Sequence, residues 1–265
     1  TQFKRPQTGM DLLTSKRAGD DGFFCLTLTA GEDAAKVADT MDYVFVLDVS
    51  GSMADDGKLG ISRDSVNAFL SELGENDRFE VMTFNTQPSL AFRQLQPATA
   101  ANKQQAATFL ASSEARGGTV LRPAIATAYK YADADRRLNV VILSDGLTEQ
   151  KERQTLLELI QQRPRNARVF CIGVGNDVNR RLLEQLAEDA GGLAAFVSSS
   201  DNFTRAARLF RQKVTSPVLA DVKIEIGGLP VSDLEPKVLP NLYHGTPVRL
   251  FGRYTKGGTA DVTLR

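Results

Sequence analysis

The stretch YVFVLDVSGS, residues 43–52, decides the fold, because an apolar run leads directly into a short polar loop. Residues 43–49 have the composition of a buried β-strand, and residues 61–73 follow with apolar side chains at helical spacing. A strand followed by a helix is the repeating unit of a parallel sheet that is covered by helices. The same unit is therefore expected to recur along the chain.

Short apolar runs and amphipathic stretches do alternate between residues 42 and 215. The predicted strands are 43–49, 78–84, 89–92, 138–143, 168–172 and 193–197. The predicted helices are 61–73, 100–111, 123–134, 149–162, 178–190 and 202–214. The run 138–143 is the most uniformly apolar, which places it at the sheet centre, and Pro88 favours an edge position for 89–92. The pattern predicts a doubly wound α/β fold, with a mostly parallel six-stranded sheet and helices on both faces.

The two ends of the chain differ in character from this region. Residues 22–29 and 218–265 show β-type alternation, glycine and proline turns, and no helical periodicity. We expect a small β-rich appendage in which the first segment pairs with the last. The predicted division is an N-terminal extension (1–39), an α/β domain (40–215) and a β-rich C-terminal segment (216–265). Since the chain begins with Thr1, we expect it to be part of a longer protein.

Composition excludes several classes of function. The 32 basic and 32 acidic residues balance, and there is no Lys/Arg run, so nucleic acid is not an expected partner. No apolar stretch approaches the roughly 20 residues that cross a bilayer, so we expect no membrane insertion. The two cysteines, Cys25 and Cys171, each lie in an apolar strand pattern and are interpreted as core thiols.

Polar loops follow the strands on which a ligand site is expected. In an open α/β sheet, ligands bind beyond the carboxyl ends of the strands. The loop after the first strand is Asp48-Val49-Ser50-Gly51-Ser52, and the loop after the central strand is Ser144-Asp145-Gly146. A third polar loop, Gly117-Gly118-Thr119, precedes a helix. Alternate residues of an extended segment face one side, and glycine permits a sharp turn, so the three polar side chains of the first loop can converge.

Together these residues offer only oxygen ligands. Asp48 and Asp145 supply carboxylates, while Ser50, Ser52 and Thr119 supply hydroxyls. A set without sulfur or imidazole favours a hard cation, Mg²⁺ first, with Mn²⁺ or Ca²⁺ also compatible. Mg²⁺ takes about six oxygens and dehydrates reluctantly, so we expect one position to stay open to solvent. A carboxylate from a partner could bind there.

Asp-x-Ser-x-Ser at 48–52, followed by Thr119 and Asp145, resembles the metal-ion-dependent adhesion site of the von Willebrand factor A family. The resemblance covers about residues 40–215. It implies that the three hydroxyls bind the metal and that the two carboxylates bind it directly or through water. Segments 77–79, 173–179 and 239–243 also resemble bacterial relatives of the inter-alpha-trypsin inhibitor heavy chains.

This resemblance implies a function without catalysis. It implies a cation-dependent adhesion or interaction domain, whose metal accepts an Asp or Glu carboxylate from a protein ligand. It also implies an extracytoplasmic location, at the cell surface, in the periplasm or in the secreted fraction. His244, the only histidine, is interpreted as a loop residue and not as a ligand or base.

Two alternatives stay open. A Mg²⁺-dependent phosphohydrolase of the haloacid-dehalogenase type would also carry an aspartate after the first strand. It requires a second acid where Ser50 stands, however, and no lysine is evident to complete its set. The other alternative is a scaffold A domain whose metal site is unused.

Overall fold

The computed structural model describes residues 8–17, 19–30, 40–146, 150–198, 201, 205, 209–210, 217–219, 222–243 and 246–264. His244 and most of the predicted helix 202–214 lie outside this part of the chain. The chain divides into two compact units. The larger is Asp39–Val214, and the smaller combines Thr1–Ala38 with Thr215–Arg265.

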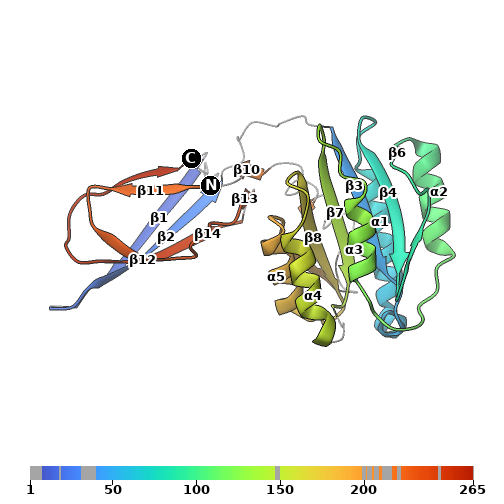
Figure 1. Ribbon diagram of the computed structural model, residues 1–265, viewed down its shortest axis with the longest axis horizontal. Coiled ribbons are helices and arrows are strands. Elements are labelled where there is room, and N and C mark those ends of the chain that lie inside the picture. Colours follow the sequence, from blue (N-terminus) through green and yellow to red (C-terminus); the bar gives the residue numbers. More distant parts are fainter. Residues whose placement is uncertain are drawn as a thin grey trace, which may run out of the picture. The chain divides into compact units, whose positions relative to one another are not determined.

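The larger unit is built on one mostly parallel sheet, with strand order β5-β4-β3-β7-β8-β9 and with β6 beside β4 (Figure 1). Its strands are β3 (Met41–Asp48), β4 (Arg78–Phe84), β5 (Pro88–Leu90), β6 (Gln96–Pro97), β7 (Arg137–Ser144), β8 (Ala167–Val174) and β9 (Ala194–Val197). The strands β5 and β6 are antiparallel to β4, and the other pairs are parallel. The predicted sheet is confirmed. The two residues of β6 are too few to produce a sequence pattern.

The helices of this unit are η1 (Gly51–Gly57), α1 (Lys58–Ser71), α2 (Ala100–Ala111), α3 (Arg122–Tyr129), α4 (Gln150–Gln161) and α5 (Arg180–Asp189). α3 ends at Tyr129 and not near residue 134 as predicted. The Asp133 side chain accepts a hydrogen bond from the Asp135 N–H at 3.2 Å, and such local bonds compete with helix formation. Among the helices that the structure describes, none has the length and apolar character needed to cross a membrane.

Helices cover both faces of the sheet, as predicted. On one face, α3, α4 and α5 pack on the side chains of the central strands, which include Val44 and Val140. On the other face, Phe69 of α1 packs edge-on against Phe45, with 5.1 Å between the ring centroids. Because neighbouring residues of β3 point to opposite faces, the strand contributes to both halves of the core.

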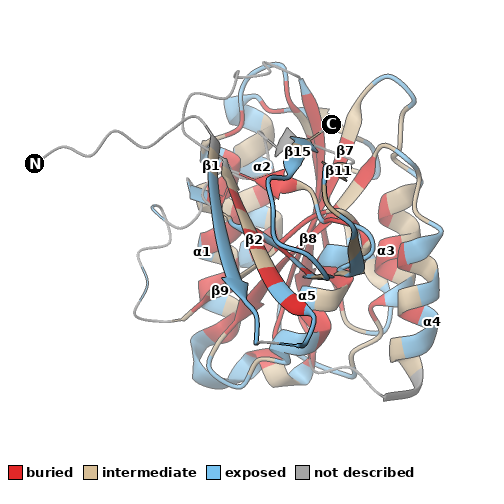
Figure 2. Cartoon of the chain, turned by 90° about the vertical axis from the view of Figure 1, so that its left-hand side faces the viewer, coloured by how far each residue is buried: buried red, intermediate tan, exposed pale blue. Residues whose placement is uncertain are grey.

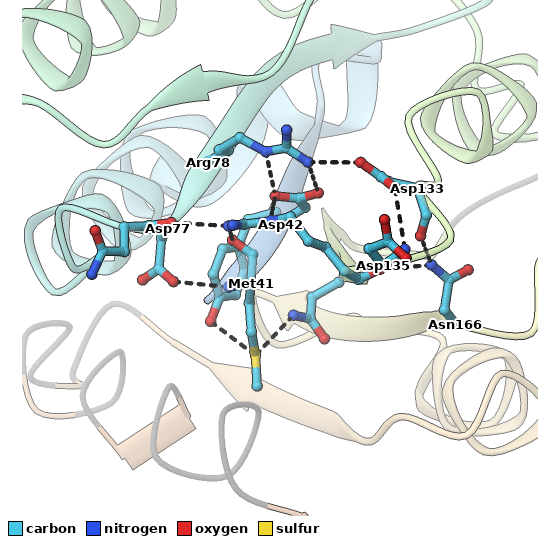
Figure 3. Close-up of polar contacts among 11 residues, drawn as sticks. Met41, Asp42, Asp77, Arg78, Asp133, Asp135 and Asn166 are labelled. Carbon is cyan, nitrogen blue, oxygen red and sulfur yellow. Dashed lines mark hydrogen bonds and ion pairs between the residues drawn. The ribbon is translucent and has the colours of Figure 1, made fainter. Parts of the chain in front are cut away.

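The amino end of β3 is fixed by an ionic network (Figure 3). The buried carboxylate of Asp42 accepts hydrogen bonds from Arg78 Nε at 2.8 Å and Arg78 Nη2 at 2.6 Å. It also accepts one from Arg136 Nε at 2.8 Å. The outer side of Arg78 faces Asp133, with Nη2 and Oδ2 3.3 Å apart. The network therefore joins β3 to β4 and to the segment that enters β7.

The smaller unit is a set of antiparallel strands drawn from both ends of the chain. Its four-stranded sheet has the order β1-β2-β14-β12, formed by β1 (Thr8–Ser15), β2 (Gly22–Ala30), β14 (Val248–Tyr254) and β12 (Val231–Glu235). Two further pairs are β10 (Pro217–Leu219) with β13 (Leu242–Tyr243), and β11 (Ile224–Gly227) with β15 (Asp261–Leu264). The pairing of β2 with β14 confirms the expected β-rich appendage from the two ends.

Strand β1 and the thiol of Cys25 depart from the predictions. β1 was not predicted, because its sequence shows no apolar alternation, and its side chains Leu12 and Leu13 are both exposed. Most of the strand is exposed (Figure 2). Cys171 is fully buried, as expected, but Cys25 is only half-buried. Its neighbours on β2 fill the core of the smaller unit, so Cys25 lies on the opposite face of the strand. The prediction of a core thiol is wrong there.

Candidate metal site

The first loop begins where β3 ends, at the fully buried Asp48. The Ser50 N–H donates to Asp48 Oδ1 at 2.8 Å, and the Oγ atoms of Ser50 and Ser52 lie 3.3 Å apart, within hydrogen-bond distance. Gly51 lies between them and permits the close approach of the loop that contains Gly117. Its N–H donates to the Gly117 carbonyl at 2.9 Å, and an added Cβ would lie 3.3 Å from the same oxygen. The three polar side chains therefore converge, as the spacing predicts.

The second loop begins at the carboxyl end of β7, the parallel neighbour of β3. Ser144 Oγ donates to Asp48 Oδ2 at 2.6 Å and accepts a bond from the Gly146 N–H at 2.9 Å. Asp145 is fully buried, and its carbonyl accepts a bond from the Asn179 N–H at 2.9 Å. These bonds place both predicted carboxylates at one edge of the sheet.

The third loop, which carries Thr119, is held against the first loop and against the end of β4. The Arg116 N–H donates to the Val49 carbonyl at 2.8 Å, and the Val120 N–H donates to the Asn85 carbonyl at 2.7 Å. Thr119 itself is half-buried. The structure thus brings all three predicted loops to the carboxyl edge of the sheet.

Two residues of this edge were not among the predicted site residues, Ser144, which belongs to the predicted second loop, and Lys58. Lys58 is 4% exposed, and its Nζ lies 3.1 Å from Asp145 Oδ2 and 3.3 Å from the Ser52 carbonyl. One signal could have drawn attention to it. Lys58 is the first residue of α1, where a positive charge opposes the helix dipole. A lysine at this position is stabilised when an acidic side chain lies beside it.

The electrostatics of the site follow from burial. Burial raises the pKa of Asp48 above its usual value, and the charge of Asp145 adds to this effect, while hydrogen bonds from Ser144 and Ser50 oppose it. Lys58 supplies one positive charge to this pair of acids. Within the described ranges no three carboxylate, imidazole or thiol groups cluster, so further cation ligands must be hydroxyls, carbonyls or water.

Comparison with known proteins agrees with this geometry. The family described as von Willebrand factor type A domain matches residues 41–196. The chain belongs to that family. The match lies within the larger unit and includes Asp48, Thr119 and Asp145, so all three loops are part of the A domain. A domains generally mediate protein–protein interactions and often depend on a metal.

The individual relatives differ in how much of them the chain covers. Human inter-alpha-trypsin inhibitor heavy chain H4 is 30% identical over 83% of this chain and 25% of its own length. The chain therefore spans about a quarter of the curated relatives that it matches. A solved von Willebrand factor type A protein from Catenulispora acidiphila is 18% identical, with a TM-score of 0.68, over 98% of this chain and 70% of that one.

A second solved structure matches a smaller share of the chain. It is an aerotolerance-related membrane protein from Bacteroides fragilis, 17% identical with a TM-score of 0.55, over 66% of this chain and 98% of that one. At such low identity the likeness shows a shared fold. The resemblance to the heavy chains and to the A family, which the motifs indicated, is thus confirmed.

Proposed function

We propose that this A domain binds a divalent cation, Mg²⁺ by preference, and uses it to hold a protein partner. The proposed ligands are Asp48, Ser50, Ser52, Thr119 and Asp145. The observation that carries the proposal is the convergence of two buried carboxylates and the hydroxyls of Ser50 and Ser52 at one edge of the sheet.

The residues present fit a hard cation. The site contains carboxylate and hydroxyl oxygens, which Mg²⁺, Mn²⁺ and Ca²⁺ prefer, and no thiol or imidazole. Asp48 is oriented on both sides, by the Ser50 N–H at 2.8 Å and by Ser144 Oγ at 2.6 Å. Ser52 and Thr119 are only half-buried, so the hydroxyl side of the site faces outward. A bound cation would supply positive charge where a partner can approach.

The chemistry of this outward side favours a carboxylate partner. A cation that is not fully neutralised attracts an anionic oxygen, and Asp and Glu side chains of a protein provide one. We further propose an extracytoplasmic location for the domain. The resemblance to the heavy chains and the shared fold with a Bacteroides fragilis membrane protein support that proposal.

Calorimetric titration of Mg²⁺ into EDTA-treated and dialysed protein tests the metal half of the proposal. We expect one binding event, which is lost in Asp48→Ala and Asp145→Ala. It should be weakened in Ser52→Ala, and because Ser52 is only half-buried, this substitution should not prevent folding. Asp55→Asn is the control, since it removes an exposed acid of η1, the helix that overlaps the end of the first loop. Circular dichroism checks the fold of each variant. Equal binding by all of these proteins would contradict the proposal.

Water-proton relaxation of the Mn²⁺-loaded domain tests the carboxylate half. Acetate that displaces water from bound Mn²⁺ lowers the relaxation rate of the solvent protons. We expect this decrease with acetate and no decrease with chloride at equal ionic strength. An identical response to the two salts would exclude an accessible carboxylate position.

The phosphohydrolase alternative gains one feature from the structure. A phosphohydrolase of this type needs a lysine in its site, and Lys58 lies beside Asp145. Ser50 still stands where that reaction needs its second acid, and Asp48 Oδ2 is occupied by the hydrogen bond from Ser144. Hydrolysis of an aryl phosphate in the presence of Mg²⁺, lost in Asp48→Asn, would favour this alternative over partner binding.

A further inference from the structure

Lys58 is an unusual side chain among the described residues of the A domain, because lysine is almost never fully buried without a partner. Its side chain is 5% exposed, and that of Asp145 is 0% exposed. The ammonium lies 3.1 Å from Asp145 Oδ2 and also donates to the Ser52 carbonyl at 3.3 Å. Both contacts are with residues of the candidate metal site.

The fold reserves space for this lysine. Gly175, in the loop after β8, has a φ of +99°, and an added Cβ would lie 2.9 Å from Lys58 Cε. The absence of a side chain at Gly175 therefore lets the lysine stem pass. Gly57, the N-cap of α1, has a φ of +69° and stands immediately before the lysine. The position is built to bring one ammonium group to the carboxyl edge of the sheet.

Helix stability does not explain this placement. A lysine in the first turn meets the positive end of the helix dipole and destabilises the helix. Burial of the ammonium adds a desolvation cost, which its contacts with Asp145 and with the Ser52 carbonyl offset. The interactions that stabilise the buried ammonium are therefore those with Asp145 and Ser52, so we expect Lys58 to act on the candidate metal site.

Charge accounts for that role. Two carboxylates and one ammonium give the site a formal charge of −1, and a divalent cation changes it to +1. Without the ammonium, the formal charge would be −2 for the empty site and zero for the site with a bound divalent cation. The lysine thus repels the incoming cation, yet it leaves the loaded site with a positive charge that a carboxylate can neutralise.

We infer that Lys58 is a built-in counter-ion that weakens cation binding and strengthens the binding of a partner carboxylate by the loaded site. This inference rests on the proposed function. It predicts that one substitution moves the two affinities in opposite directions. A residue that only supports the structure would move both in the same direction or move neither.

The test compares Lys58→Met with wild type, and Lys103→Met serves as a matched control. Lys103 also donates to a backbone carbonyl, that of Leu73 at 2.9 Å, but it belongs to α2 and contacts no site residue. We expect Lys58→Met to bind Mn²⁺ at least about tenfold more tightly, because a nearby positive charge is removed. We expect acetate to bind the Mn²⁺-loaded variant more weakly than it binds loaded wild type. Lys103→Met should match wild type in both measurements.

A second variant protects the test against misfolding. Lys58→Gln is neutral but keeps a hydrogen-bond donor for Asp145 and the Ser52 carbonyl, and it should shift both affinities in the same directions as Lys58→Met. Binding of Mn²⁺ only to the neutral variants would contradict the inference and the proposed function, because wild type would then have no loaded site to hold a carboxylate.

Two other results would overturn the inference, and they differ in what they say of the proposed function. Equal Mn²⁺ affinities in wild type and both Lys58 variants would remove the inference and leave the metal site in place. A complete lack of Mn²⁺ binding by all variants would remove both, and Lys58 would then be a structural partner of Asp145.

Discussion

Ser144 Oγ donates a hydrogen bond of 2.6 Å to Asp48 Oδ2 and so joins the carboxyl ends of β7 and β3. The hydroxyl is itself held by the Gly146 N–H at 2.9 Å. With the Ser50 N–H on Oδ1, both oxygens of the Asp48 carboxylate have a fixed direction. Outer hydrogen bonds of this kind orient metal ligands and contribute to metal affinity.

We therefore expect Ser144→Ala to weaken Mg²⁺ binding by about tenfold or more, because Asp48 loses the donor on one oxygen. Calorimetric titration of the metal measures the change. Ser62→Ala is the matched control, since Ser62 is also buried but its hydroxyl has no hydrogen-bond partner in the described part of the chain. A Ser144→Ala protein that binds Mg²⁺ as tightly as wild type would show that Asp48 is oriented without this bond.

The sequence predicts the three loops of the site, but it does not predict how they are held together. The loops could be placed because parallel strands end at the same edge, so residues after β3 and β7 must be neighbours. The bond between Ser144 and Asp48 depends on side-chain directions in two strands that are far apart in sequence. No local pattern reveals it.

The same distinction applies to the rest of the fold. Buried strands such as β7 are visible in the sequence, since both faces are apolar and the run is continuous. Strand β1 is not visible in the sequence. Its pairing with β2, and not its own composition, makes it a strand, and its apolar side chains are exposed. The placement of Lys58 was missed for a related reason, since a lysine after a polar loop is usually exposed.

The second prediction concerns the amino end of the sheet. Asp42 is buried and accepts hydrogen bonds from Arg78 (Figure 3). It accepts another from Arg136. Asp42→Asn removes the negative charge between the two guanidinium groups, and we expect the free energy of unfolding to fall by about 3 kcal/mol. Urea denaturation followed by circular dichroism measures the loss. Mg²⁺ affinity should stay unchanged, because the network and the site lie at opposite ends of β3.

Asp133→Asn is the control for this prediction. Asp133 also pairs with Arg78, at 3.3 Å, but its side chain is 44% exposed and solvent screens the interaction. The loss of stability should be much smaller than for Asp42→Asn. Equal losses in the two variants would mean that burial of Asp42 is not what makes its ion pairs important.

The third prediction uses the carboxylate of Glu80. Burial raises its pKa above the ordinary 4.5, although backbone N–H groups of Phe92, Val81 and Arg93 and the Tyr131 hydroxyl oppose the shift. The folded state therefore holds this proton more tightly than the unfolded state does. As the pH rises above 4.5 towards the pKa of the folded state, stability is lost.

Glutamine does not ionise, so Glu80→Gln is free of this loss. Its free energy of unfolding relative to wild type should increase as the pH rises from about 4 to about 7. The glutamine oxygen can still accept from the Val81 N–H and the Phe92 N–H, which contact Oε1 at 2.8 and 3.0 Å. Urea denaturation at several pH values gives the difference. Glu75→Gln, which changes an exposed acid, is the control and is measured alongside. A constant difference for Glu80→Gln would contradict the assignment.

The fourth prediction is that the two thiols differ in reactivity. Burial raises the pKa of Cys171 to about 12, so at pH 8 nearly all of it is the unreactive thiol. Cys171 is also fully buried in the core that α3, α4 and α5 cover. Cys25 is half-buried in the smaller unit. We expect an aromatic disulfide reagent to label Cys25 in the folded protein and Cys171 only when the A domain unfolds.

Labelling of the native protein should therefore show a fast phase from Cys25 and a slow phase from Cys171. The slow phase should be absent in Cys171→Ser, and the fast phase should be absent in Cys25→Ser. Because labelling of Cys171 requires unfolding, a ligand that binds only the folded A domain should slow it in proportion to its occupancy. Mg²⁺ should then slow the labelling of Cys171 without slowing that of Cys25. In Asp145→Ala, which should not bind the cation, Mg²⁺ should have no effect on either phase. Equally rapid labelling of both thiols in the native protein would show that the core around β8 is open to solvent.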